Sequence, residues 1–314
     1  MPIFITLIIL FLTSYKVLAE TDFPGVNLPS YETGQYVHTA PDIHQLKNNP
    51  DIHPKLKATI LKGYDLFLNT QQLRGKYIFN DMNCGSCHMG AGAKNWSSPV
   101  WAAATTLPDY RGKNDRVNTL EDRIAGCFSY SMNGIPPAYD SPEMVALVTY
   151  HQWLATGAPV YEYNIGGRGF DHLGKQPPVD LDYQQGQNVY QRECAICHGN
   201  DGAGQQVDGV IVFPPLWGDN SYNWGAGIVR IFTAASYIHN NMPYGKPGSL
   251  TAEDAWQVAN FINSHERPQD PRYTGDVKET REKYLNFHQF SHYGLEINGR
   301  LLGNHNNTGG KPKQ

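Results

Sequence analysis

Apolar side chains recur at helical spacing near the end of each half of this 314-residue chain. In the second half they form a single stripe, at Ala255, Val258, Ala259, Phe261 and Ile262. This spacing predicts an amphipathic helix that begins near Thr251. In the first half we expect the corresponding helix from about Pro142 to Leu154, because proline is tolerated in a first helical turn.

Each half also opens with a candidate helix marked by a glycine and, four positions later, an aromatic residue. In the second half this pair is Gly186 and Tyr190. In the first half the sequence leaves two pairs open: Gly63 with Phe67, and Gly75 with Phe79. The repeated order of elements indicates an imperfect internal duplication.

One Cys-x-x-Cys-His motif lies in each half. The two motifs consist of Cys84, Cys87 and His88, and of Cys194, Cys197 and His198. In such a motif both thiols can add to the vinyl groups of a haem, and the histidine becomes the proximal ligand of the iron. A lone Cys-x-x-Cys would also suit zinc or dithiol chemistry. Two copies, each followed by histidine, predict two covalently attached haem c groups.

The order of helix, haem motif, glycine-rich loop and closing helix resembles a class I cytochrome c domain. We therefore predict an all-α fold of two class I cytochrome c domains, an N-terminal one over residues 20–158 and a C-terminal one over residues 183–269. Residues 159–182, rich in glycine, proline and turn residues, would form the linker. Residues 270–314 would be a C-terminal extension, with a helix from about Val277 to Phe287 capped by Asp276.

The N-terminus predicts export. Residues 3–12 are almost wholly apolar, and Ala19 ends a small-residue cleavage site, so residues 1–19 are typical of a signal peptide and favour a periplasmic location. The apolar run is short for a membrane span, so we expect no integral span after signal cleavage. The net charge is −4 and there is no basic tract, which argues against nucleic-acid binding.

The sequence determines the distal ligand of the second haem more clearly than that of the first. Met242 is the expected ligand of the second haem. It is followed by Pro243 and lies nine residues before Thr251, where we expect the closing helix to begin. For the first haem two residues remain open. Met132 has the same register, nine residues before Ser141, whereas Cys127 follows Arg123 by one helical turn. A neighbouring cation lowers the pKa of a thiol and favours the thiolate that binds iron.

The segment from Glu121 to Gly134 resembles the signature of the dihaem thiosulfate dehydrogenases. The likeness extends through both haem motifs and three further segments, Trp101-Ala102-Ala103-Ala104, Gly167-Arg168-Gly169 and His265-Glu266-Arg267-Pro268. It implies that Cys127 is the distal ligand of the active-site haem, and that Met132 belongs to the motif without being a ligand. The remaining site residues that it implies are Arg123 and a second cation, Arg116 or Lys113, for anion binding, and Ser131 as a further active-site position.

The resemblance implies an enzyme that couples two thiosulfate ions to tetrathionate, in either direction, and exchanges electrons with a small c-type cytochrome. Some family members carry a ligand lysine before the distal methionine; Asn241 stands here, so we expect His198 and Met242 to remain the ligands in both redox states. The alternatives are a non-enzymatic dihaem electron-transfer cytochrome c with Met132 as ligand, a dihaem cytochrome c peroxidase, and a haem subunit of a larger sulfur-oxidising complex.

Overall fold

The computed structural model describes residues 36–285, 291–304 and 309–310 of the chain. The predicted signal peptide, residues 1–19, lies outside the described residues, as does Phe287 at the predicted end of the extension helix. Within the described part of the chain, no helix combines the length and the apolar character needed to cross a membrane.

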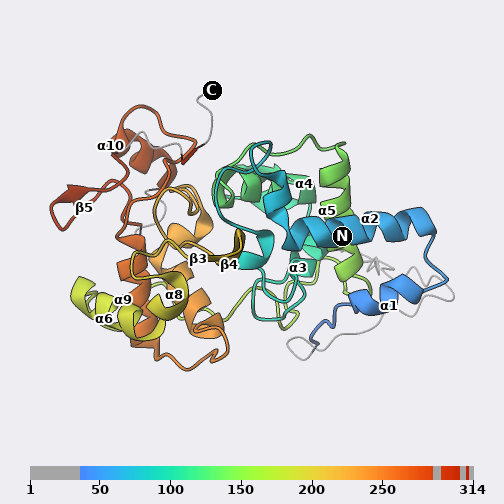
Figure 1. The fold of residues 1–314 in the computed structure, drawn as a ribbon, viewed down its shortest axis with the longest axis horizontal. Helices are drawn as coiled ribbons and strands as arrows, with labels where there is room; N and C mark the ends of the chain where they lie inside the picture. Colours follow the sequence, from blue (N-terminus) through green and yellow to red (C-terminus); the bar gives the residue numbers. More distant parts are fainter. Residues whose placement is uncertain (1–35, 286–290, 305–308, 311–314) are drawn as a thin grey trace, which may run out of the picture. The chain divides into compact units, whose positions relative to one another are not determined.

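Helices dominate both halves of the chain (Figure 1), which agrees with the predicted all-α class. The first half contains α1 (Ile43–Asn48), α2 (Pro54–Leu68), α3 (Trp101–Thr106), α4 (Leu120–Gly126) and α5 (Pro142–Leu154). The second half contains α6 (Tyr183–Glu193), α7 (Ala195–His198), α8 (Ile231–Asn241) and α9 (Ala252–Asn263), and the extension adds α10 (Val277–Thr280).

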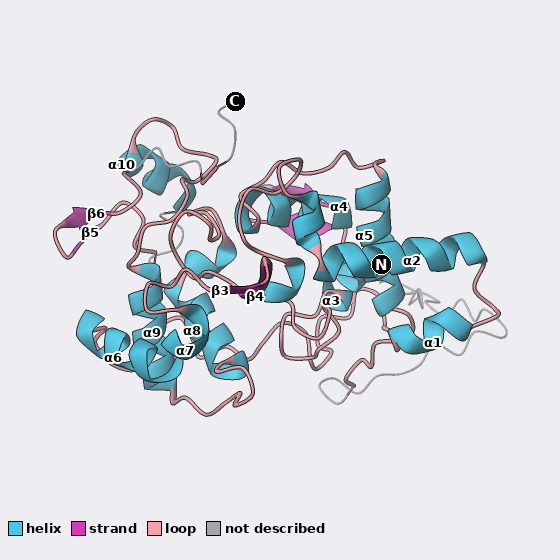
Figure 2. Ribbon diagram, viewed as in Figure 1, coloured by secondary structure: helices cyan, strands magenta, loops and turns pink. Residues whose placement is uncertain are grey.

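Short strands and single turns complete the regular structure (Figure 2). The strands form three antiparallel pairs: β1 (Asp109–Arg111) with β2 (Arg116–Asn118), β3 (Gln205–Val207) with β4 (Val210–Phe213), and β5 (Glu296–Ile297) with β6 (Arg300–Leu301). Three 3₁₀ turns occur at Thr70–Leu73, Cys84–Ser86 and Gly227–Val229, and two π-helical turns at Cys127–Ser131 and Arg281–Leu285.

The closing helices begin where the sequence predicts, because side chains cap their free N–H groups. The Ser141 hydroxyl accepts a hydrogen bond from the backbone N–H of Met144 (3.2 Å), just before Pro142 in the first turn of α5. The Thr251 hydroxyl likewise accepts from the N–H of Asp254 (3.0 Å) at the start of α9. Both predicted helix starts are confirmed.

The extension helix differs from its prediction. Asp276 caps it as expected, but the α-helical part ends at Thr280 and continues as the π-helical turn from Arg281 to Leu285. Thr280 uses its hydroxyl to donate to the Asp276 carbonyl oxygen at 2.6 Å. This side-chain bond to the preceding turn competes with regular helix continuation.

A glycine lets the first and last helices of each half cross closely. A Cβ added at Gly63 of α2 would lie 2.1 Å from the Ala146 carbonyl oxygen of α5, and one at Gly186 of α6 would lie 2.2 Å from the Gln257 carbonyl oxygen of α9. The equivalent contacts confirm the duplication. They also identify Gly63 with Phe67 as the first-half counterpart, since Gly75 lies in a turn with φ of +78°.

The buried apolar residues form two cores, and the first core extends beyond the first half. The second core lies among α6, α8 and α9. The first core, built on α2 and α5, continues into Tyr222 and Trp224 of the second half and into Val277 and Tyr293 of the extension. The rings of Trp224 and Tyr293 meet edge to face, with centroids 5.6 Å apart. The extension is therefore part of the packed structure.

Candidate functional site

The first haem motif opens into a cavity that also reaches the segment around residue 127. The lining includes both thiols of the motif and its histidine together with Cys127, Ser131 and Met132. His151 of α5 lines it as well and bonds through Nδ1 to the Leu147 carbonyl oxygen at 2.8 Å. Two thiols and an imidazole on one apolar cavity, with the side chains of Cys127 and Met132 beside them, suit the attachment and ligation of a haem c. The residues present therefore fit the predicted cofactor.

Both motif histidines are oriented in the same way. Nδ1 of His88 lies 2.6 Å from the carbonyl oxygen of Ser98, and Nδ1 of His198 lies 2.8 Å from the carbonyl oxygen of Pro214. When Nδ1–H donates to a carbonyl, the lone pair of Nε2 is left for a metal and the ring orientation is fixed. The second motif thus repeats the arrangement of the first.

The Cys127 thiol is the group in this cavity that ionises most readily. Burial raises its pKa, but hydrogen bonding from His88 and the positive charges of Arg123, His88 and Arg111 outweigh burial and lower the pKa to about 7. Burial raises the pKa of both Cys84 and Cys87 to about 12. One cavity thus holds two thiols whose pKa is raised and one whose pKa is lowered.

The π-helical turn Cys127–Ser131 continues α4, which begins with a capping box. Thr119 accepts from the N–H of Asp122 at 3.3 Å, and the Asp122 carboxylate accepts from the N–H of Thr119 at 3.0 Å. Thr119 and Asp122 thus satisfy two N–H groups that would otherwise be free at the start of α4. A π-helical turn widens a helix locally and occurs often at functional sites; here it begins at Cys127 itself.

Residues of the second half hold this turn in place. The side-chain amide of Asn223 donates to the carbonyl oxygen of Ser129 at 2.9 Å, and its backbone N–H donates to the carbonyl oxygen of Tyr130 at 3.1 Å. Asn80 is fully buried, and its side-chain amide nitrogen donates to the carbonyl oxygens of both Ser131 (2.8 Å) and Ser221 (3.0 Å). The turn that carries Cys127 is therefore positioned from both halves.

Cations from both halves surround the turn. Arg111 of β1 lies close enough to Arg123 and Cys127 for their charges to interact. Arg230, at the start of α8 in the second half, faces the same two arginines. Burial lowers the pKa of Lys113 to about 7, assisted by the charges of Arg272 and Arg111. Arg111, Lys113 and Arg230 are partly buried, whereas Arg123 is exposed, and together such a group of basic side chains suits a multiply charged anion.

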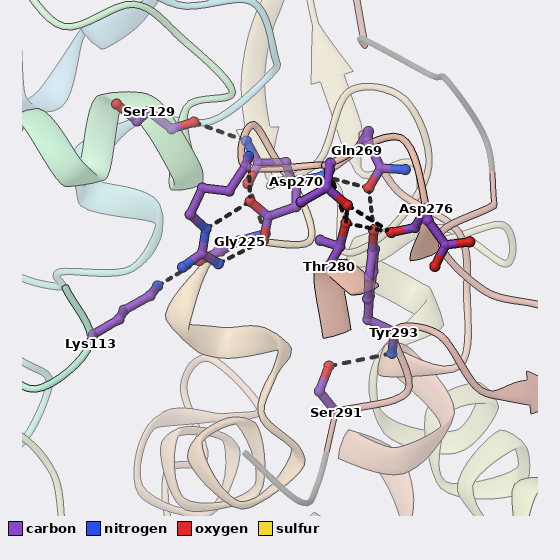
Figure 3. Close-up of polar contacts among 12 residues, drawn as sticks. Lys113, Ser129, Gly225, Gln269, Asp270, Asp276, Thr280, Ser291 and Tyr293 are labelled. Carbon is purple, nitrogen blue, oxygen red and sulfur yellow. Dashed lines mark hydrogen bonds and ion pairs between the residues drawn. The ribbon is translucent and has the colours of Figure 1, made fainter. Parts of the chain in front are cut away.

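Lys113 and Arg272 also contact the turn directly. The Lys113 ammonium donates to the carbonyl oxygen of Gly225 at 2.7 Å (Figure 3) and lies 4.5 Å from the centre of the Tyr130 ring. The Arg272 guanidinium lies 5.2 Å from the same ring and pairs with Asp270 at 2.6 Å. The ring of Tyr130 thus lies beside two basic side chains, Lys113 from the first half and Arg272 from the C-terminal extension.

Arg116, one of the two cations suggested for anion binding, lies elsewhere. Its guanidinium pairs with Asp122 at 2.5 Å, and its side chain is 58% exposed. It is the cross-strand partner of Arg111 in the β1–β2 pair. Arg111 was not singled out by the sequence, because no motif marks a strand residue that reaches a site only through the hairpin fold.

The second site is built from α7 and the end of α8. Cys194 and Met242 both pack against the second core, and Met242 directly follows the last residue of α8. Burial raises the pKa of the Cys194 thiol to about 12, as at the first motif. Asn241 occupies the position before the methionine and is buried.

Models of two cytochrome c families match the chain. The SoxA/TsdA cytochrome c domain matches residues 74–160, and cytochrome c oxidase, cbb3-type, subunit III matches residues 181–262. The match of one cytochrome c model to each half agrees with the predicted fold class of two cytochrome c domains, and it implies haem c cofactors.

Similar proteins share a name. The chain is 48% identical over 245 residues to thiosulfate dehydrogenase of Stutzerimonas stutzeri (strain A1501), covering 78% of this chain and 79% of that protein. It is 47% identical over 241 residues to thiosulfate dehydrogenase of Thiomonas intermedia (strain K12), covering 77% and 76%. Among solved structures, thiosulfate dehydrogenase (TsdBA) from Marichromatium purpuratum, as isolated, superposes with a TM-score of 0.79 and 42% identity, over 85% of this chain and 58% of that one.

Proposed function

This chain belongs to the thiosulfate dehydrogenase family of c-type cytochromes, and on that premise we propose that it couples two thiosulfate ions to tetrathionate in the periplasm. The two electrons released would pass to a small c-type cytochrome. The same site would serve the reverse reaction when the supply of electrons and tetrathionate favours it, because a catalyst accelerates both directions.

Two covalently attached haem c groups would supply a pair of one-electron carriers, which matches the two electrons of the reaction. The attaching residues are Cys84 and Cys87 with His88, and Cys194 and Cys197 with His198. We assign Cys127 as the distal ligand of the first iron and Met242 as that of the second. A thiolate favours a low reduction potential and a thioether a high one, so electrons would run from the first site to the second.

Cys127 would also be the residue that reacts with the substrate. Its thiolate forms a sulfur–sulfur bond with the outer sulfur of one thiosulfate, and this oxidation gives up two electrons. A second thiosulfate then attacks the same outer sulfur. Tetrathionate leaves, and Cys127 departs as the thiolate, so sulfur and charge balance once the two haem groups, and then the partner cytochrome, would have accepted the two electrons.

The observation that carries this proposal is the placement of Cys127, which lines the same cavity as the motif thiols and His88. The positive charges of Arg123 and Arg111 act on its thiol and, with His88, lower its pKa against the effect of burial. A thiolate at this position suits both iron ligation and attack on a sulfur atom. A simple electron carrier has no use for a third thiol beside its haem.

The surrounding cations would bind the substrate dianions. Arg123 and Arg111 are the two arginines whose positive charges act on Cys127. We assign to Arg111 the second anion-binding role, for which the sequence suggested Arg116 or Lys113. Planar guanidinium groups suit the paired oxygens of a sulfonate end. Ser131 lines the cavity and would donate its hydroxyl there.

The decisive experiment replaces Cys127 with glycine in the haem-loaded protein. We expect both haems to remain attached while thiosulfate-dependent haem reduction is lost by several orders of magnitude, and the near-infrared signature of thiolate-bound iron disappears. Met132→Leu is the matched control in the same cavity and should keep both properties. The opposite pattern, with Met132→Leu altering the iron and Cys127→Gly active, would favour the non-enzymatic electron-transfer cytochrome.

A further inference from the structure

Ser97 of the first half and Asn241 of the second half form a fully buried contact. Ser97 has no exposed surface and Asn241 is 2% exposed. The Ser97 hydroxyl donates to the Asn241 side-chain oxygen. The Asn241 amide nitrogen donates to the carbonyl oxygens of Trp96 (3.4 Å) and Tyr237 (3.1 Å). Both ends of the amide are thus bonded, which fixes its orientation.

Asn241 is next to a residue that we assign to a haem iron, and Ser97 is next to the residue that orients another. Ser98, next to Ser97, provides the carbonyl oxygen that orients the His88 ring. Asn241 immediately precedes Met242 and ends α8. The contact therefore joins the proximal side of the first site to the distal side of the second.

The first-half segment is held stiffly. Trp96 and Ser98 have φ angles of +64° and +54°, in the left-handed region that non-glycine residues avoid. Their N–H groups donate to the carbonyl oxygens of Gly167 (2.9 Å) and Gly169 (2.7 Å) in the segment between the two halves. A backbone in such a conformation persists only when its surroundings determine it strongly. The segment is a firm anchor for Asn241.

We propose that the Ser97–Asn241 contact positions Met242 and couples the ligation of the two haem sites. The inference rests on the proposed function, in which Met242 binds the second iron. Asn241 acts as a positioning residue and has no contact with substrate. Asn241 has no amine that could bind the iron. Its side-chain amide instead fixes the backbone next to Met242 through its hydrogen bonds.

The physical basis is the weakness of a thioether ligand. A methionine sulfur binds iron through a soft, weak bond, so its occupancy depends on how well the protein positions it. Loss of the Ser97 hydroxyl would leave the Asn241 oxygen buried without that donor, which favours a shift of the end of α8. The effect would appear at the second iron although Ser97 lies in the first half.

The test uses the full-length, haem-loaded protein in four forms: Ser97→Ala, Asn241→Leu, the double variant, and Asn240→Leu as the matched control. Asn240 lies on the same helix end but bonds to Asp171 and to Ser236 rather than to Ser97. Two readouts apply besides activity: the far-red absorption band of methionine-bound ferric haem, and the midpoint potential of the second centre. We expect Ser97→Ala and Asn241→Leu each to weaken the band and lower the potential.

The double variant should resemble the more affected single variant, because both changes remove the same bond. Asn240→Leu should retain the wild-type band. A wild-type band and potential in Ser97→Ala would overturn the proposal. Because Ser97→Ala removes only one oxygen atom, it gives a clear answer even if Asn241→Leu fails to load both haems.

Met242→Ala separates the two possible failures. If it keeps the band, the ligand assignment of the proposed function is wrong and the coupling proposal falls with it. If it loses the band while Ser97→Ala keeps it, the ligand assignment stands and only the coupling is wrong.

Discussion

The side-chain amide of Asn223 donates a 2.9 Å hydrogen bond to the carbonyl oxygen of Ser129, two residues after Cys127. The same amide donates to the Asn133 side-chain oxygen at 3.1 Å. Asn223 is fully buried and belongs to the second half, whereas the turn that it holds belongs to the first. The position of the Cys127 sulfur therefore depends on both halves.

Replacing Asn223 with leucine should lower kcat for thiosulfate by roughly tenfold or more, because two buried acceptors lose their donor and the turn shifts. Steady-state kinetics with haem content measured in parallel would test this. Asn188→Leu is the control: Asn188 accepts from Gln184 on the exposed face of α6, and kcat should stay unchanged. An Asn223→Leu protein with wild-type kcat would contradict the positioning role.

Arg111 and Arg116 should differ sharply in their effect on substrate binding. We expect Arg111→Gln to raise KM for thiosulfate by about 10–100-fold, the worth of a charge-assisted hydrogen bond to an anion. Arg116→Gln removes only an exposed ion pair with Asp122 and should change KM by less than about threefold. Initial rates over a range of thiosulfate concentrations distinguish the two, and equal effects would argue against our assignment.

Alanine at either helix-crossing glycine should destabilise the fold. The added methyl group of Gly63→Ala or Gly186→Ala would overlap a backbone carbonyl oxygen, and such overpacking costs about 1–3 kcal/mol. Gly126→Ala is the control, since Gly126 has a helical φ of −62° and its nearest neighbour is the Arg111 guanidinium at 3.8 Å. That variant should be neutral or slightly more stable in chemical denaturation. Unchanged stability at both crossings would show that the helices can separate freely.

His292 should make stability depend on pH. Burial, with the charges of Arg281 and Arg267, lowers its pKa to about 4, and its Nε2 bonds to the Asn260 side-chain oxygen at 2.8 Å. Because the unfolded chain takes up the proton at higher pH, this contribution is complete above pH ~6.5 and is lost as pH falls towards 4, by at most about 3 kcal/mol.

His292→Gln keeps a donor to Asn260 and cannot become charged, so the variant should lose less stability between pH 7 and pH 4.5 than the wild type. Denaturant unfolding at several pH values measures the difference. The same substitution at the exposed His172 should leave the pH profile as it is. Parallel curves for His292→Gln and wild type would exclude this histidine as a source of the dependence.

Features set by local chemistry could be predicted from the sequence. The caps at Ser141 and Thr251 depend on residues within one helical turn, and the two haem motifs each depend on five consecutive residues. The crossing glycine could not be chosen in advance. Gly63 is marked out by its contact with α5, which is distant in sequence, whereas Gly75 lies in a turn and a Cβ added there would have no neighbour within 4 Å.

The candidate site was harder to predict for the same reason. Arg111 and Arg116 are direct partners in the β1–β2 register, and their spacing in the sequence does not reveal which of the two is near Cys127. Arg230 and Asn223 come from the second half, and nothing in the motif around Cys127 refers to them. Contacts between segments a hundred residues apart are set by packing.

The bond from Asn223 to Ser129 also limits how freely this protein can be recombined. Duplicated modules are often treated as interchangeable parts, yet here one module supplies the hydrogen bonds that hold the Cys127 turn of the other. A chimera that exchanges the second module for an unrelated cytochrome would need to carry the loop around Asn223 along with it. The two copies therefore depend on each other for the geometry around Cys127. A change in one copy that moves this contact has to be matched by a change in the other.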